Sequence, residues 1–255
     1  EPKFTHSQAK MPAVKLLSNR NLLLMNISNF MQKMLMSAAF IVIPIAIVKY
    51  FGMDKKDLSG IYSVATVFGF IAMGIGGAIG ETKRITKQIL VIGVSLFVVC
   101  YGLFALSLGH KPLFYAGVII FFIGFNLHEP ILQSMASKFS KVSQKGAVLG
   151  IFNAFGYMGS FIGGICGGTL LKFYGLSALS AVVTVLCVVW LIALKWLDNP
   201  NIFKNIYLPS DTDADLAEVE KQKGVVECYK NAQNLVVKYN SKLTNEAEIK
   251  RILGV

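Results

Sequence analysis

Two charged side chains lie inside long apolar stretches of this sequence, and their types could do chemistry there. Lys33 lies within residues 22–49, and Glu129 lies within residues 112–136. A charge deep in a hydrocarbon layer costs several kcal/mol unless it is paired or hydrated. An ammonium group can hold a carboxylate in an ion pair, and a carboxylate can bind and release a proton. We therefore expect Lys33 and Glu129 to pair with each other in at least one state of the protein.

Each charge also has a plainer explanation. Lys33 could extend its long side chain to the membrane surface, but it lies about 11 residues, or roughly 16 Å, inside its stretch. That depth favours a cavity. Glu129 lies some seven residues, or about 10 Å, from the end of its stretch, so a purely structural ion pair and a proton-binding carboxylate both stay open. His128, next to Glu129, is expected to be a hydrogen-bonded neighbour rather than a proton carrier.

Polar side chains accompany both charges at helical spacing. In residues 22–49 they recur at steps of three or four, which places them on one face of a helix. Residues 112–136 and 146–171 carry similar polar faces. The residues that we expect to line a substrate path or to couple protons are Lys33, Glu129, Asn126, Asn29, Asn26, Gln133, His128, Asn153 and Tyr157.

Six apolar stretches are long enough to position these residues inside a membrane. A helix needs roughly 20 residues to cross about 30 Å of hydrocarbon, and helices satisfy the backbone there. The predicted spans are 22–49, 58–80, 89–109, 112–136, 146–171 and 176–197. The third and the sixth are the most uniformly apolar and are expected to face lipid. The predicted fold class is an all-α polytopic membrane protein, followed by a small α+β domain.

The composition excludes several other classes of protein. The 255 residues are 54% hydrophobic and 15% charged, with a mean hydropathy of +0.58 and a net charge of +11. Soluble domains carry about 25% charged residues, and so apolar a chain would not stay disordered. The positive charge lies between apolar runs, which favours a membrane over a nucleic-acid partner. No set of nucleophile, base and orienting residue points to an enzyme.

The sequence predicts no metal or other cofactor. Three of the four cysteines lie inside predicted spans, and none has the Cys-x-x-Cys spacing of a zinc or redox site. They are expected to be small packing residues.

Basic residues in the short connections predict the orientation, because such residues accumulate on the cytoplasmic side. The connections after the second and fourth spans, and the arm 1–20, carry most of them. Both ends of the chain are therefore expected in the cytoplasm, with the chain spanning the inner (plasma) membrane several times.

Glycines in the fifth span form a pattern of small residues at every fourth position, which lets helix backbones approach closely. The predicted packing residues are Gly156, Gly159, Gly163 and Gly167.

After Asp198 the hydropathy falls, and residues 202–255 form a separate domain. Strands are predicted over 204–209, 225–229 and 235–239, with helices over about 214–223 and from Thr244 or Asn245 to about 253. Asp211 or Asp213 is expected to cap the first helix. The order β-α-β-β-α resembles a ferredoxin-like fold without its last strand. The domain also resembles heavy-metal-associated domains, but its segment 209–213 lacks the two cysteines with which those domains bind metal. Its expected role is therefore docking or self-association.

These motifs together resemble the C-terminal six-helix half of the major facilitator superfamily. The segment from Gly77 to Arg84 is similar to the acidic-basic loop motif of that superfamily, although it lacks the full Asp-Arg-x-Gly-Arg-Arg core. The stretch Asn126-Leu-His-Glu129-Pro130, with the glycines that follow, resembles the tenth and eleventh helices of drug:proton antiporters. The YajR-like branch of those antiporters ends in a small cytosolic domain.

The resemblance implies a fold of twelve helices in two halves around a site at the membrane midplane. Residues 1–20 would then be the end of the central loop, and residues 21–198 would be the membrane domain. The six helices of this chain would pair with the other six-helix half of the transporter or with a second copy of the chain. The implied function is proton-coupled efflux of small amphipathic molecules or drugs. A non-transporting membrane anchor or sensor, which presents its tail to a cytosolic partner, is the alternative.

Overall fold

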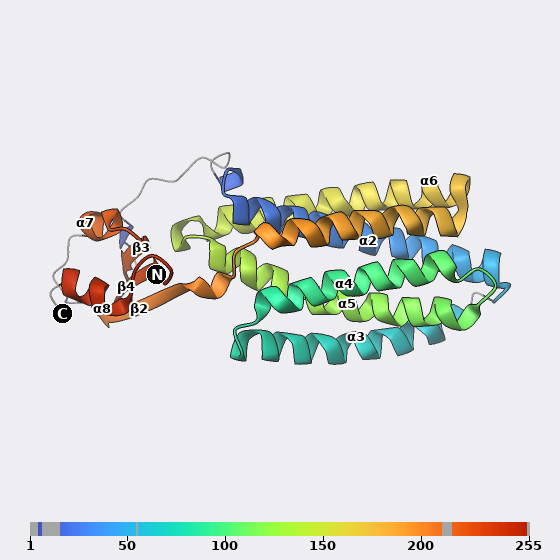
Figure 1. Cartoon of the computed structure of the whole chain (residues 1–255), viewed down its shortest axis with the longest axis horizontal. Helices are drawn as coiled ribbons and strands as arrows, with labels where there is room; N and C mark the ends of the chain where they lie inside the picture. Colours follow the sequence, from blue (N-terminus) through green and yellow to red (C-terminus); the bar gives the residue numbers. More distant parts are fainter. Residues whose placement is uncertain (1–4, 7–15, 55, 211–215, 254–255) are drawn as a thin grey trace.

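Long apolar runs form a bundle of helices, with a small sheet domain at one end (Figure 1). The computed structural model describes residues 5–6, 16–54, 56–210 and 216–253. The long helices are α2 (Arg20–Phe51), α3 (Asp57–Thr82), α4 (Thr86–Leu106), α5 (Lys111–Phe139) and α6 (Lys145–Ala193). Three short 3-10 helices are η1 (Val142–Gln144), η2 (Leu194–Trp196) and η3 (Pro200–Ile202).

The last two predicted spans, 146–171 and 176–197, correspond to the two helical parts of α6, which are separated by a kink. Helix α6 runs through 49 residues and takes in both predicted stretches. Gly175 interrupts it with φ 77° and ψ 179°, a conformation that essentially only glycine adopts. The chain reverses direction there, at the end of the bundle away from the sheet domain (Figure 1). Among the described residues, five helices are long and apolar enough to cross a membrane.

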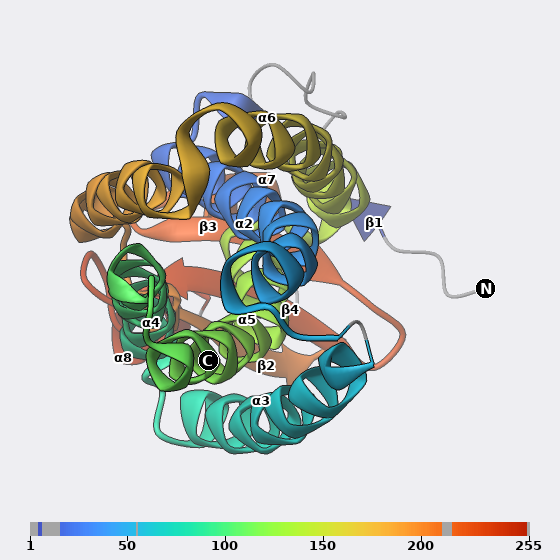
Figure 2. The same ribbon diagram turned by 90° about the vertical axis from the view of Figure 1, so that its right-hand side faces the viewer.

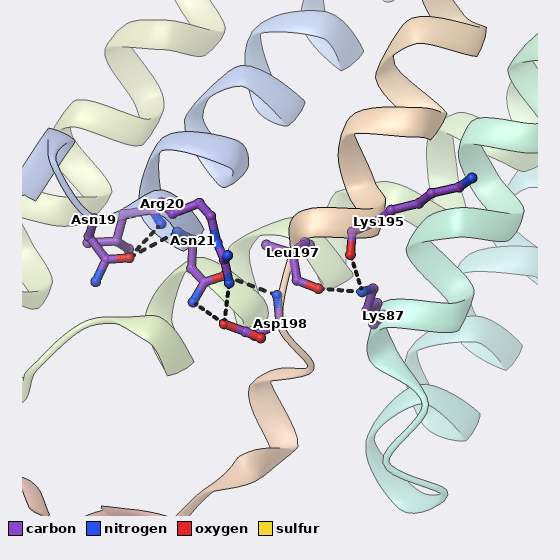
Figure 3. A network of polar contacts seen from close by, with 8 residues as sticks. Asn19, Arg20, Asn21, Lys87, Lys195, Leu197 and Asp198 are labelled. Atoms are coloured by element: carbon purple, nitrogen blue, oxygen red, sulfur yellow. Dashed lines mark hydrogen bonds and ion pairs between the residues drawn. The ribbon is translucent and has the colours of Figure 1, made fainter. Parts of the chain in front are cut away.

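The first and last parts of the bundle are joined at the end nearest the sheet domain (Figure 3). Arg20 Nη2 and Asn21 Nδ2 donate to Asp198 Oδ2 at 2.9 and 3.1 Å, and the Asp198 backbone N–H donates to Asn21 Oδ1 at 3.0 Å. Lys87 Nζ donates to the carbonyl of Leu197. Asn19 caps α2 by accepting from two backbone N–H groups. The bundle is thus closed at this end by polar contacts between elements far apart in sequence.

Helices α2 and α6 pack at backbone distance, which the glycine stripe of α6 permits. A Cβ atom added at Gly159 would lie 2.2 Å from the carbonyl oxygen of Phe30, and one at Gly163 would lie 2.1 Å from that of Met34. Gly156 and Gly167 also face α2. All four predicted packing glycines therefore lie at this helix–helix contact.

Burial of the helices differs from what their composition suggested. In the most apolar 18-residue stretch of α4, 44% of the residues are buried inside the bundle. This uniformly apolar helix was expected to face lipid. Its aromatic residues Phe97, Tyr101 and Phe104 are fully or almost fully buried. Helix α3 is only 11% buried in its corresponding stretch. Uniform hydrophobicity therefore did not distinguish the helix that packs from the helix that is exposed.

The sheet domain has one layer of helices on one layer of strands. Its elements are β2 (Phe203–Pro209), α7 (Leu216–Lys221), β3 (Val225–Lys230), β4 (Asn234–Asn240) and α8 (Glu246–Ile252). Val219 of α7 and Ile249 of α8 share one apolar core with all three strands. Asn245 caps α8 by accepting from the Glu248 N–H at 2.9 Å. The caps predicted at Asp211 and Asp213 lie outside the described residues.

A strand from the far end of the sequence completes the sheet. Residues Thr5–His6 form β1, which pairs antiparallel with β3. The sheet order is β1-β3-β4-β2, and all of its pairs are antiparallel. The arm 1–20 was predicted to be the end of a central loop, and no strand was predicted within it.

The face of the sheet away from α7 and α8 contacts the bundle. Glu227 on β3 and Lys238 on β4 are paired in register across the strands. Glu227 Oε2 accepts from the Val142 N–H at 2.7 Å and Oε1 from the Ser143 N–H at 3.3 Å. Lys238 Nζ donates to the carbonyls of Lys138 and Ser140, both at 2.7 Å. Two neighbouring side chains of opposite charge thus hold the loop that joins α5 to α6.

We expect this contact to strengthen as pH rises above 8. Burial is the largest cause that lowers the pKa of Lys238 from 10.5 to about 8; nearby Lys145 and Lys141 lower it further, while Glu227 opposes them. Between pH 8 and pH 10.5 the undocked state therefore binds more protons than the docked state. The free energy that favours docking of the sheet domain should therefore increase by up to about 1.4 kcal/mol per pH unit between pH 8 and pH 10.5.

Fluorescence energy transfer between dyes on the sheet domain and the bundle, followed during urea titration, would measure this dependence. Lys238→Met is the control and should remove the Lys238 part of the slope. An identical slope in Lys238→Met and in the wild type would contradict this assignment.

Candidate functional site

A cavity of about 300 Å³ lies between α2, α5 and α6, which lie next to one another when the bundle is viewed along its length (Figure 2). Its polar lining comes from all three helices: Asn29, Gln32, Lys33, Glu129, Gln133, Asn153, Tyr157 and Ser160. Apolar side chains of Met36, Leu132 and Phe152 complete the wall. The cavity therefore has both polar and apolar surface.

Lys33 and Glu129 form an ion pair at this cavity, as the sequence predicted. Lys33 Nζ lies 3.0 Å from Glu129 Oε1 and 2.9 Å from Oε2. The Lys33 side chain is 24% exposed and that of Glu129 is 36% exposed. Both charges are thus partly desolvated and neutralise each other, yet both reach the cavity surface. A proton delivered to Glu129 would weaken the pair, because a neutral carboxyl group attracts the ammonium less.

Gln32 belongs to this site, although it is not among the residues predicted from the sequence to line a path. Its Nε2 donates to Glu129 Oε2 at 3.1 Å and to the carbonyl of Phe125 at 3.2 Å. The Phe125 ring also lies under the Lys33 ammonium, with 5.4 Å between Nζ and the ring centroid. The position next to Lys33 was the available signal, but spacing alone did not show which way the amide points.

Asn29 ties the cavity to the close contact of α2 with α6. Its Nδ2 donates to the carbonyl of Phe152 at 2.7 Å. A Cβ atom at Gly156 would lie 2.6 Å from the same Nδ2. The amide therefore fits a space that only a glycine leaves, and it fixes the two helices beside the ion pair.

Three of the predicted site residues lie outside the cavity. Asn26 is buried, and Asn126 donates to the Phe122 carbonyl within its own helix and faces Gly69 of α3. His128 is fully buried, and its Nε2 donates to the Leu90 carbonyl at 2.9 Å. Asn126 and His128 are thus held by contacts within the bundle, and a role of these three residues in a polar path stays a prediction.

The cavity offers an ion pair and amide groups rather than metal ligands. Across the described ranges, no three His, Cys, Asp or Glu side chains form a cluster that could hold a metal ion. The chemistry available here is the making and breaking of the ion pair, together with hydrogen bonding by the amide and hydroxyl groups of the lining.

Comparison with known proteins identifies relatives among membrane transporters. An uncharacterised transporter of Buchnera aphidicola is 31% identical over 180 residues, which are 70% of this chain and 45% of that protein. The inner membrane transport protein YajR of Escherichia coli is 26% identical over 247 residues, 94% of this chain and 54% of YajR. The chain spans about half the length of these relatives.

The model of one family covers most of the sequence. The Major Facilitator Superfamily model matches residues 8–231, which include all the long helices and the cavity between them. The apolar helices agree with a protein that crosses the membrane several times. The chain therefore belongs to the Major Facilitator Superfamily of membrane transporters.

Proposed function

We propose that this chain forms the C-terminal six-helix half of a secondary transporter that exports small amphipathic molecules or drugs in exchange for protons. The ion pair of Lys33 and Glu129 at the cavity carries this proposal. A carboxylate that alternates between a lysine partner and a proton can link proton entry to a change of the cavity, because the two states differ in charge.

The lining of the cavity supports the class of substrate. Apolar groups of Met36, Leu132 and Phe152 lie beside amide and hydroxyl groups. Binding sites for small molecules commonly combine an apolar wall with a few polar groups. A flat molecule with one polar or cationic end fits that combination. The alternative, a membrane anchor or sensor, does not explain why Lys33 and Glu129 lie inside apolar helices.

The topology of the membrane domain is part of this proposal. We infer that α6 crosses the membrane twice, with the reversal at Gly175, so that the bundle has six crossings and both its ends face the cytoplasm. The relatives are about twice as long as this chain, which supports a partner half of six helices or a second copy. The inner membrane is the proposed location, since the YajR relative is named as an inner membrane protein. The order β2-β4-β3 supports a ferredoxin-like cytosolic domain without its last strand.

Efflux from cells tests the proposal directly. In bacteria without their main multidrug exporters, the intact protein should lower the steady-state accumulation of ethidium, an amphipathic cation, by several-fold. A protonophore should abolish this effect, whereas valinomycin, which removes only the electrical potential, should leave part of it. Ethidium export that persists unchanged with the protonophore would refute proton coupling.

A further inference from the structure

A basic groove lies between the sheet domain and the end of the bundle, away from the ion-pair cavity. It joins two neighbouring hollows of about 330 and 420 Å³, which share Lys138, Asn201, Phe203 and Asn205. We call it the junction groove. Its basic residues are Lys138, Lys145 and Lys238 in the first hollow, and Arg84, Lys138 and Lys204 in the second.

Positive charge exceeds negative charge along this groove. Glu81 is the one carboxylate among the described residues that line it, and its Oε2 is already paired with Lys138 Nζ at 2.5 Å. Glu227 lies nearby, but its two oxygens accept from backbone N–H groups. Within the described part of the chain, Lys145 has no carboxylate partner. Glu246 interacts with Lys204 and Glu227 with Lys238, but among the described residues that line the groove the basic groups still outnumber the carboxylates.

The excess of positive charge disfavours the charged form of Lys238, which lines the groove. Its ammonium donates two hydrogen bonds to the carbonyls of Lys138 and Ser140, which leaves one of its three N–H groups for another acceptor. Burial lowers its pKa, and the charges of Lys145 and Lys141 lower it further. An anion bound beside Lys238 would offset both effects.

We propose that the junction groove binds a phosphate group, carried either by a small soluble metabolite or by the headgroup of an anionic lipid. Phosphate oxygens accept several charge-assisted hydrogen bonds at once, and lysine is a common partner for them. Amides of Asn201 and Asn205 and the hydroxyl of Ser137 add neutral polar groups to the lining. The first hollow has the volume of a small-molecule site.

Occupancy of this groove would link two parts of the protein. Lys238 and Tyr229 belong to the sheet domain, whereas Lys145 begins α6, the helix that carries Asn153 and Tyr157 at the ion-pair cavity. A phosphate group that contacts both sides would hold the sheet domain against the loop between α5 and α6. The ligand would thereby stabilise one arrangement of the helices around the cavity, which goes beyond the proposed export activity.

Binding to the intact purified protein tests the proposal without any transport assay. Inorganic phosphate should raise the melting temperature in detergent more than chloride does at equal ionic strength. Lys145→Gln removes a lysine of the first hollow that forms no ion pair with any described carboxylate. It should weaken phosphate binding, measured by calorimetry, about tenfold, or about 1.4 kcal/mol. Lys204→Gln tests the second hollow in the same way. Lys111→Gln, at the opposite end of the bundle, is the matched control and should bind phosphate like the wild type.

A second arm distinguishes the two sources of phosphate. The same variants are placed in nanodiscs of phosphatidylcholine with or without phosphatidylglycerol. Stabilisation by phosphatidylglycerol that Lys145→Gln removes, without an effect of inorganic phosphate, assigns the groove to a lipid headgroup. The reverse pattern assigns it to a soluble phosphate compound. Equal responses of wild type, Lys145→Gln and Lys204→Gln in both arms would overturn the proposal.

Discussion

Replacing Glu129 with glutamine is expected to reduce proton-driven export by about 100-fold or more, the lower range for loss of a proton-transferring side chain. Glutamine keeps the size of the side chain and one of its two accepting oxygens, but it cannot alternate between a charged and a neutral form. It also leaves the Lys33 ammonium without the carboxylate that lies 2.9 Å away. Proton entry would then no longer change the charge of the cavity.

Initial rates of ethidium export under an imposed pH gradient measure this effect, together with the amount of protein in the membrane. Glu246→Gln is the matched control, because Glu246 is also paired with a lysine, Lys250, but on the exposed helix α8. That variant should export like the wild type. Unchanged export by Glu129→Gln over a range of pH would remove Glu129 from the mechanism.

The charge-swapped double variant Lys33→Glu with Glu129→Lys separates a role in coupling from a role in assembly. Each single change places two like charges next to each other, and the swap restores attraction. If the pair serves assembly alone, the swap should recover both protein level and export. If Glu129 carries the proton, the swap should recover the protein level more than the export.

Replacing Gly163 with alanine is expected to destabilise the bundle by about 3 kcal/mol, at the upper end for overpacked contacts. The new Cβ atom would lie 2.1 Å from the carbonyl oxygen of Met34, and that atom belongs to a helix backbone. A flexible side chain could turn away, but here α2 and α6 must separate. The separation would also disturb Lys33, which lies one residue before Met34.

The neighbouring glycine supplies a matched control. A Cβ atom at Gly164 would meet nothing nearer than 3.8 Å, so Gly164→Ala should keep or slightly raise stability through the better helix propensity of alanine. Both variants share that intrinsic gain, and their difference isolates the close contact. Melting followed by fluorescence size-exclusion chromatography would measure it. Similar melting temperatures for both variants would show that the helices do not pack this closely.

Single charges in apolar sequence were the most informative part of the prediction. Lys33 and Glu129 needed partners, and each was the most suitable partner for the other, so their contact could be expected without a structure. The same reasoning could not place Asn26, Asn126 and His128, because an amide or imidazole is satisfied equally well by a backbone carbonyl inside the bundle. His128 found such a carbonyl at Leu90.

Other features depend on contacts that local sequence does not encode. The break between the two predicted stretches of α6 could not be assigned to Gly175 from the sequence, because Gly175 is one of many glycines there and only its φ of 77° marks it. The role of Lys238 was equally hidden, since its carbonyl partners lie about 100 residues away. Helical periodicity predicts which residues share a face, but it does not predict which neighbour covers that face.

The pairing of β1 with β3 has a consequence for the order in which the protein is made. Thr5 and His6 are synthesised before the long helices α2 to α6 of this chain, whereas their partners Lys230 and Tyr229 are synthesised after these five helices. The edge of the sheet can therefore close only once the whole bundle has left the ribosome, and such distant pairing is slow to form. A completed sheet thus marks a chain whose synthesis has passed α6, and the segments before α2 and after α6 are then held together at one end of the bundle.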